Sequence, residues 1–214
     1  MRPIPIPKND FGKNVIPAML GNGERMAAYR FAGYWKDVGT LESLWDANMD
    51  MLSPESGLDL HDESWPIYAR SVNAPPTFLG EDSHVTHSAF NRGSVLDGTV
   101  ENSVLSSNVR VGKGARVSYS VLLPNTVVED GAVVEYAIWR SCKIGAGCQV
   151  GGTPESAAPA PWGLTVLAPH CELEAGKRVR PGIMLDRKWR GGIQEMNGLH
   201  GIIFSYENAR TCGS

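Results

Sequence analysis

The most suggestive chemistry of this chain lies in residues 35–40, which read W-K-D-V-G-T. Asp37 brings a carboxylate, and Mg²⁺ prefers oxygen ligands of this kind. Trp35 brings an apolar ring face that can lie against a sugar ring. A tryptophan and an aspartate followed by Gly-Thr and an amphipathic stretch are typical of a catalytic pocket. An aspartate that caps a helix or lies at the surface is the alternative, and the residue types alone favour it.

A second group of candidate residues is basic and lies in the stretch Y-A-I-W-R-S-C-K-I-G, residues 136–145. The guanidinium of Arg140 presents a planar fork of donors that matches phosphate oxygens, and Lys143 adds a second cation nearby. Such residues can bind an anionic ligand. Solvated side chains on an exposed face are an equally good interpretation.

Composition limits the class of protein. The 214 residues are 42% hydrophobic and 20% charged, as in a globular protein with a core, and the net charge is −3. This charge predicts no nucleic-acid partner, and no run of about 18 apolar residues predicts a membrane span. The cysteines lack C-x-x-C spacing, which argues against a zinc site and predicts free thiols in a reducing cytoplasm. They are Cys142, Cys148, Cys171 and Cys212.

Residues 1–52 are predicted to form an α/β segment that positions Asp37. Asp10 can cap a helical turn, and Pro17 would break or restart that helix. The alternating pattern of residues 25–35 predicts a strand or hairpin leading to Trp35.

A second helix is predicted directly after the W-K-D-V-G-T stretch. Thr40 can cap it, and Glu42 lies in the first turn, where the helix dipole favours an acid. The helix has one apolar face, consisting of Leu41, Leu44, Trp45, Met49 and Leu52. Residues 53–77 are rich in Pro, Ser and acid and are predicted to be a connector.

Residues 78–151 repeat. Gly114, Gly131 and Gly147 are 17 and 16 residues apart, and each lies in a frame [VI]-x-x-G-x-x-V. An apolar β-branched residue recurs every five or six positions, which fits neither a half-buried strand nor a helix. A triangular parallel β-helix, with three short strands in each coil of roughly 16–18 residues, fits this spacing. A β-sandwich is the alternative, but its strands would alternate at period two.

The predicted β-helix points its β-branched residues inward and turns at each corner. Gly112, Asp130 and Gly145 are expected to take the backbone conformations that other residues resist. About four coils fit, which is enough for neighbouring coils to cover each other. The β-helix domain is predicted over residues 78–190, with a loop and a last irregular coil or cap after residue 151.

The motifs N-D-F-G-K-N-V-I-P-A-M-L, G-Y-W-K-D-V-G-T-L-E-S-L-W-D-A-N-M-D-M-L, W-P-I-Y and A-P-P-T-F-L-G occur in this order before the hexapeptide coils. Together, over about residues 8–185, they resemble the C-terminal half of bacterial glucose-1-phosphate adenylyltransferase (ADP-glucose pyrophosphorylase). The resemblance implies a left-handed β-helix that forms homo- or hetero-oligomer contacts. It also implies synthesis of ADP-glucose and pyrophosphate from ATP and glucose 1-phosphate with Mg²⁺, for glycogen biosynthesis in the cytoplasm.

The resemblance assigns roles to the candidate residues. Asp37 matches an aspartate that ligates Mg²⁺ in the family, and Asp10, Phe11 and Trp35 match its glucose 1-phosphate pocket. Arg140 and Lys143 lie where related enzymes bind an anionic effector. This last match is weaker, because Trp139 replaces an aspartate common at that position of the family.

The 214 residues contain no G-G-x-G-x-R-L-x-P-L-T loop, with which the family binds its nucleotide. The chain is therefore expected to be a fragment, with residues 1–52 the remnant of a nucleotidyltransferase domain, and to be inactive alone. A non-catalytic β-helix module that pairs with full-length subunits is the alternative. The tail, residues 191–214, resembles the first strand of the paralogous glycogen-biosynthesis subunit, which suggests a junction between two genes.

Overall fold

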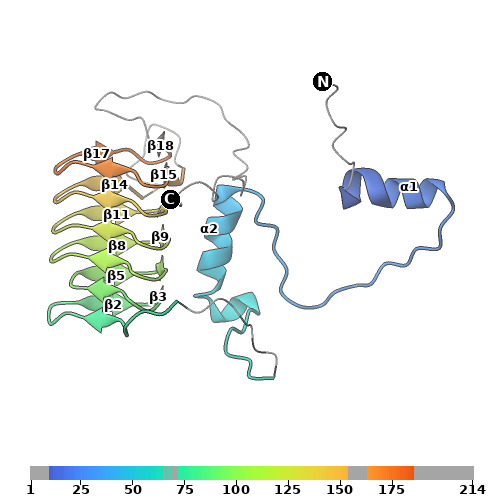
Figure 1. Cartoon of the computed structure of the whole chain (residues 1–214), viewed down its shortest axis with the longest axis horizontal. Helices are drawn as coiled ribbons and strands as arrows, with labels where there is room; N and C mark the ends of the chain where they lie inside the picture. The colour runs from blue at the N-terminus through green and yellow to red at the C-terminus, as the bar shows by residue number, and fades with distance from the viewer. Residues whose placement is uncertain (1–9, 65, 67, 69–71, 154–162, 186–214) are drawn as a thin grey trace, which may run out of the picture. The chain divides into compact units, whose positions relative to one another are not determined.

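The computed structural model describes residues 10–64, 66, 68, 72–153 and 163–185, and the tail at residues 191–214 lies outside them. The chain divides into two compact units, Met1–Gly33 and Tyr34–Ser214 (Figure 1).

The first unit contains a π-helical turn, η1 (Phe11–Val15), that continues into α1 (Ile16–Gly21). The Asp10 side chain accepts a hydrogen bond from the Lys13 N–H at 2.7 Å, so the predicted cap is confirmed. Pro17 lies in the first turn of α1, where its missing N–H has no intrahelical partner to lose.

The strand or hairpin predicted over residues 25–35 is wrong. This stretch has no strand, and none of the described strands pairs with it. Its alternating side chains are almost all exposed, and without a neighbouring strand the backbone gains no ladder of hydrogen bonds.

The second unit begins with the segment that carries Asp37 and with α2 (Leu41–Asp50). Thr40 and Ser43 form a capping box, so the cap predicted at Thr40 is confirmed. The predicted apolar face of α2 packs against the β-helix through Leu41, Leu44, Trp45 and Met49. The connector begins with a 3₁₀ turn, η2 (Pro54–Ser56).

The rest of the described chain is a parallel β-helix with three faces (Figure 1), as predicted. Face A consists of β1 (Phe78–Leu79), β4 (Val95–Leu96), β7 (Arg110–Val111), β10 (Val127–Val128), β13 (Lys143–Ile144) and β16 (Glu172–Leu173). Face B consists of β2 (His84–Thr86), β5 (Thr99–Glu101), β8 (Arg116–Ser118), β11 (Val133–Glu135), β14 (Gln149–Gly151) and β17 (Arg178–Val179). Face C consists of β3 (Ala89–Phe90), β6 (Val104–Leu105), β9 (Val121–Leu122), β12 (Ala137–Trp139), β15 (Thr165–Leu167) and β18 (Met184–Leu185).

Each described face has six strands. About four coils were predicted for residues 78–151, and this stretch holds four complete coils and two strands of a fifth, β1 to β14, so the prediction is confirmed. The inner position of face A is leucine in the first, second and last coils, which therefore lack the Val or Ile of the repeat frame. The chain from residue 152 to 164 separates β14 from β15, yet β15 pairs with β12 in register, Ile138 opposite Val166. The predicted last irregular coil is thus a regular one.

The turn residues were assigned wrongly. Positive φ angles occur at Gly114, Gly131 and Gly147, at 64–66°, and not at the predicted Gly112, Asp130 and Gly145. Gly112 is needed for another reason: a Cβ there would lie 2.7 Å from the backbone N of Asp130 in the next coil. The Asp130 side chain instead accepts a hydrogen bond from the Lys113 N–H at 2.9 Å.

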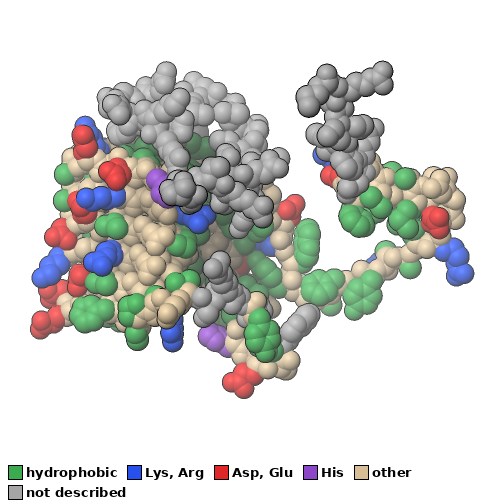
Figure 2. Space-filling model, viewed as in Figure 1, with side chains coloured by type: hydrophobic (Ala, Val, Ile, Leu, Met, Phe, Trp, Pro, Cys, Tyr) green, Lys and Arg blue, Asp and Glu red, His purple; other side chains and the backbone are tan. Residues whose placement is uncertain are grey.

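The three faces differ in what covers them. Face C is buried on both sides, because Val121, Ile138 and Val166 point outward and pack against α2. Its inward side chains, Leu122 and Trp139 among them, belong to the main core. On the exposed part of the β-helix, acidic and basic side chains are interspersed (Figure 2).

Candidate functional site

Asp37 lies at the surface on the loop before α2. One carboxylate oxygen accepts a hydrogen bond from the Gly39 N–H at 3.0 Å, which closes a tight Asx turn. Thr40, not Asp37, caps the helix. The second oxygen of Asp37 has no hydrogen bond among the described residues and faces solvent, so it could ligate a cation.

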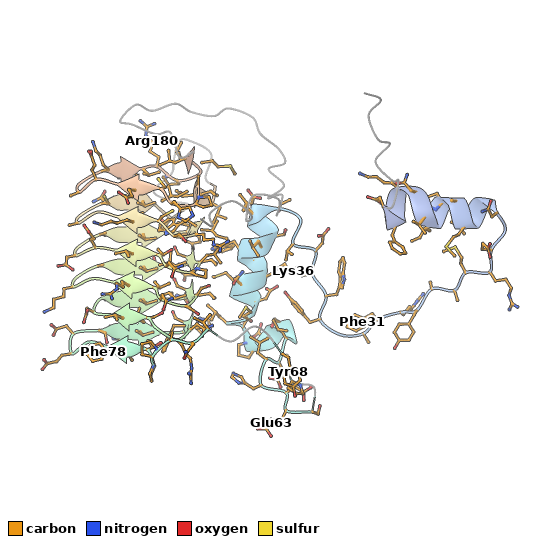
Figure 3. The ribbon with its side chains drawn as sticks, in the orientation of Figure 1. Phe31, Lys36, Glu63, Tyr68, Phe78 and Arg180 are labelled. Carbon is orange, nitrogen blue, oxygen red and sulfur yellow. The ribbon has the colours of Figure 1, made fainter. Side chains whose placement is uncertain are left out.

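The residues flanking Asp37 are tied to the far end of α2. Asp50 accepts hydrogen bonds from Tyr34 Oη at 2.9 Å and from Lys36 Nζ at 2.7 Å. Lys36 Nζ also lies 3.8 Å from Asp46 Oδ2. Figure 3 labels Lys36 beside α2. Because Thr40 caps the first turn and Asp50 is its last residue, residues 34–40 are held at both ends of the helix.

This contact shifts the titration of its members. The hydrogen bond from Lys36 lowers the pKa of Asp50, and the same hydrogen bond raises the pKa of Lys36. Desolvation first, and then the hydrogen bond to Asp50, raise the pKa of Tyr34. The carboxylate of Asp50 is therefore engaged by a cation and is a poor candidate for a metal ligand.

The predicted sugar-binding residues are divided between the two units. Asp10 and Phe11 lie in the first unit, where Asp10 caps a helical turn and the Phe11 ring is 72% exposed. Trp35 lies in the second unit and is 76% exposed. Neither aromatic ring is used for core packing, so the alternative of buried packing residues does not hold for them.

The predicted anion-binding residues lie on different parts of one coil: Arg140 is at the corner between faces C and A, and Lys143 is the first residue of β13 on face A. Arg140 follows β12 and is exposed. Lys143 Nζ lies 2.8 Å from Glu129 Oε1, and this hydrogen bond raises the pKa of Lys143 and lowers that of Glu129. Trp139 points into the core and is 2% exposed, so it does not line the surface beside Arg140. An anion would have to compete with Glu129 for Lys143.

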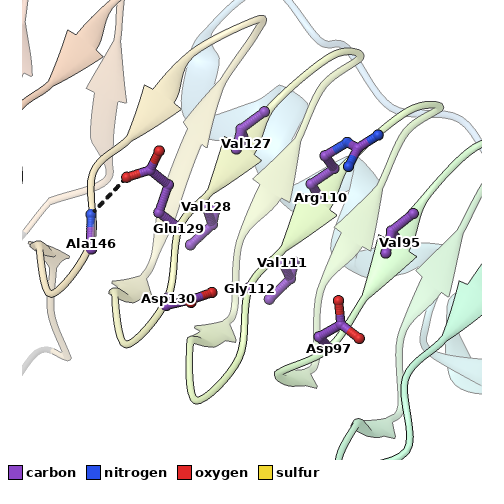
Figure 4. Close-up of a pocket in the computed structure, with 10 residues that line it drawn as sticks. All are labelled: Val95, Asp97, Arg110, Val111, Gly112, Val127, Val128, Glu129, Asp130 and Ala146. Atoms are coloured by element: carbon purple, nitrogen blue, oxygen red, sulfur yellow. Dashed lines mark hydrogen bonds between the residues drawn. The ribbon is translucent and has the colours of Figure 1, made fainter.

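A shallow groove of about 360 Å³ runs along face A (Figure 4), and no sequence motif predicts it. Arg110 lies on its floor between Val95 and Val127, which are paired with it in register. Asp97 and Glu129 line the rim. With carboxylates beside a single guanidinium, the groove is a poor site for phosphate.

A Mg²⁺ site is only partly supported by these residues. Among the described residues, no three or more His, Cys, Asp or Glu side chains are grouped so that they could hold a metal. Mg²⁺ commonly takes one or two carboxylates and completes its shell with water and substrate phosphates. Asp37 fits the role of one such carboxylate but does not form a site by itself.

Two buried thiols lie near Arg140. Burial raises the pKa of Cys142 to about 11, and burial also raises that of Cys171. Both are free, as is Cys148, which agrees with the prediction of free thiols, while Cys212 lies outside the described residues.

The described helices are all too short or too polar to be candidates for membrane spans.

Comparison with known proteins finds two family matches in the chain. The nucleotidyl transferase family matches residues 6–54, and the C-terminal hexapeptide family typified by GlmU matches residues 75–160. A glucose-1-phosphate adenylyltransferase of Clostridium perfringens (strain SM101 / Type A) is 48% identical over 153 residues, 68% of this chain and 39% of the relative.

Two further relatives have the same printed name. That of Clostridium beijerinckii is 45% identical over 154 residues, 67% of this chain and 39% of its own. That of Bacillus cytotoxicus is 46% identical over 134 residues, 63% of this chain and 36% of its own. The chain thus spans about two fifths of the length of these relatives. Over that part, the chain is homologous to glucose-1-phosphate adenylyltransferases, and within it a short nucleotidyl transferase match precedes a hexapeptide match.

Proposed function

We propose that these residues form the C-terminal part of a glucose-1-phosphate adenylyltransferase, which joins ATP and glucose 1-phosphate into ADP-glucose and pyrophosphate. The observation that carries the proposal is the exposed Asp37 on a segment fixed to both ends of α2. The identity of 45–48% with enzymes of that printed name supports it. The whole reaction needs residues beyond those present here.

In this reaction, a phosphate oxygen of glucose 1-phosphate attacks the α-phosphorus of ATP, and pyrophosphate leaves. Bound Mg²⁺ would neutralise the charge that develops on the transferred phosphoryl group. Asp37 would hold that cation through the carboxylate oxygen that the Asx turn leaves unused. Trp35 offers its exposed ring face to the glucose ring. In the first unit, Phe11 has an exposed ring of the same kind and Asp10 has carboxylate oxygens that accept hydrogen bonds from sugar hydroxyls, and each is proposed by itself as a glucose 1-phosphate-binding residue.

The 214-residue polypeptide is proposed to be inactive by itself, because its sequence contains no glycine-rich nucleotide loop of the family type. Its second proposed role is that of a non-catalytic module whose β-helix pairs with full-length subunits, as a homo- or hetero-oligomer. The regular coils and the exposed residues at the first coil, Phe78 and Leu79, favour this second role.

The first experiment follows pyrophosphate release from ATP and glucose 1-phosphate with Mg²⁺. The chain is assayed alone, as the Asp37→Asn variant, and mixed with the full-length Clostridium perfringens relative. We expect no release by the chain or its variant alone. Release that disappears in Asp37→Asn would show a complete nucleotide site and overturn the proposed inactivity. Co-elution with the full-length relative, with a change in its rate, would support the module role.

A further inference from the structure

Two tyrosines occupy corners of the β-helix where bulky side chains are unfavourable. Tyr119 and Tyr136 have φ angles of 47° and 48°, in the left-handed region. The corresponding corners of the first two coils carry His87 and Asn102, and asparagine tolerates this region far better than an aromatic residue does. A strained residue of the wrong type indicates that its side chain has a specific use.

The use is visible in the contacts of the two rings. They stack with centroids 4.7 Å apart and planes 6° apart. The ring of Trp45, from α2, lies 5.9 Å from that of Tyr136 and is tilted by 35°. Trp45 Nε1 donates a hydrogen bond to the backbone oxygen of Tyr119 at 2.8 Å. This contact joins residues 74 positions apart and is directional, unlike the apolar packing beside it.

The same helix carries the contacts that fix Asp37. Its N-terminal cap, Thr40, directly follows the Asx turn of Asp37, and its last residue, Asp50, holds Lys36. A displacement of α2 over face C would therefore carry Asp37 with it. The corner tyrosines lie at one end of this series of contacts and the Asp37 carboxylate at the other.

We propose that Tyr119 and Tyr136 form a clasp for Trp45, and that Trp45 is a positioning residue that sets the location of Asp37 relative to the β-helix. The clasp itself is independent of the enzymatic role. Only its consequence for a metal at Asp37 rests on the proposed function. The opposing interpretation is that the tyrosines merely stabilise the coils. The two interpretations differ in how replacing the tyrosines changes hydrogen exchange in the β-helix strands: the opposing one expects faster exchange there, and the proposal does not.

The test is amide hydrogen exchange on the 214-residue chain with both tyrosines replaced, Tyr119→Asn/Tyr136→Asn. Asparagine relieves the unfavourable φ, so exchange in the β-helix strands should stay equal or slow down. Exchange in residues 41–50 should accelerate about fivefold, the effect of losing the contact between the rings of Trp45 and Tyr136, because the backbone oxygen of residue 119 still accepts the hydrogen bond from Trp45. Trp45→Phe keeps a ring and removes only the donor, so it should also accelerate this exchange, by the effect of one hydrogen bond.

Two matched controls separate the clasp from general destabilisation. Tyr119→Phe keeps the ring and the backbone oxygen that Trp45 binds, and should retain the protection of α2. His87→Asn changes the same corner position in the first coil and should leave α2 unchanged. Asp50→Asn should accelerate exchange in residues 34–40 without affecting the strands, since it weakens only the contact between Lys36 and the end of α2.

Unchanged exchange of α2 in the double variant would overturn the proposal. Equal acceleration in α2 and in the strands would also overturn it, because the tyrosines would then only stabilise the coils. No substrate is used, so an inactive chain cannot produce either result, and the failure of the proposed enzymatic role is seen separately in the pyrophosphate assay.

Discussion

Replacing Trp139 by phenylalanine should change the stability of the β-helix very little, although Trp139 is a large, buried core residue. Its ring is 2% exposed and faces inward on β12, stacked between Leu122 of β9 and Leu167 of β15. Its indole N–H is the one buried side-chain polar atom in the described residues without a hydrogen-bond partner.

Two effects of the substitution oppose each other. A buried unsatisfied donor costs about 1–3 kcal/mol, which phenylalanine does not incur. Phenylalanine is smaller by about 40 Å³, and at about 24 cal/mol per Å³ the cavity costs about 1 kcal/mol, with a similar loss of apolar burial. The free energy of unfolding of Trp139→Phe should therefore lie within about 1 kcal/mol of the parent, whereas Trp139→Ala should lose about 3–5 kcal/mol.

The measurement is equilibrium unfolding in urea, followed by far-UV circular dichroism on the chain and both variants. Leu167→Ala, at the next inward position of face C, is the reference for a core cavity without an unsatisfied donor, and should cost about 3–5 kcal/mol. A loss above about 2.5 kcal/mol in Trp139→Phe would refute the reasoning, because it would show that the indole N–H has a partner such as a buried water.

Three further outcomes are expected. Because burial raises the pKa of Cys142 to about 11 and also raises that of Cys171, a thiol reagent at pH 8 should modify neither thiol until urea is added. The same thiols ionise first in the unfolded state as the pH rises above about 9, so the free energy of unfolding should fall above that pH, as urea unfolding at a series of pH values would show. Glu129→Gln should change stability little by urea unfolding, because the ion pair with Lys143 is exposed, and should strengthen binding of inorganic phosphate by calorimetry if Lys143 takes anions. Thr40→Ala should lower the stability of α2 by about 1 kcal/mol, measured by hydrogen exchange, and Thr40→Ser should restore it.

The β-helix was predictable because its spacing is rigid. Neighbouring coils must stay in register, so the left-handed φ of Gly131 recurs in the two coils beside it, at Gly114 and Gly147. The sequence shows this period, but it does not show which glycine is needed for φ and which for space. Gly112 gives no local signal, because its neighbour, Asp130, belongs to the next coil.

The candidate site was only half predictable, for a similar reason. The spacing of Leu41, Leu44 and Trp45 predicts an apolar face on α2, but no local pattern says what covers it. The outer side chains of face C carry a signal in the sequence: Val121 is apolar, whereas the outward residues of the same coil on faces A and B include Arg110 and Arg116. The hydrogen bond from Trp45 to Tyr119 depends on a corner conformation that a propensity argument would reject.

The stretch at residues 152–164 has a consequence for how such a chain can change. It lengthens one corner, yet Thr165 resumes its place opposite Ala137. A strand therefore keeps its register when residues are added before it, because the register is set by pairing with the neighbouring coil and not by the number of residues in the corner. New segments can therefore be inserted at the corners without shifting the pairing of the strands. A fluorescent peptide inserted after Gly152 should therefore leave the coils on both sides in register.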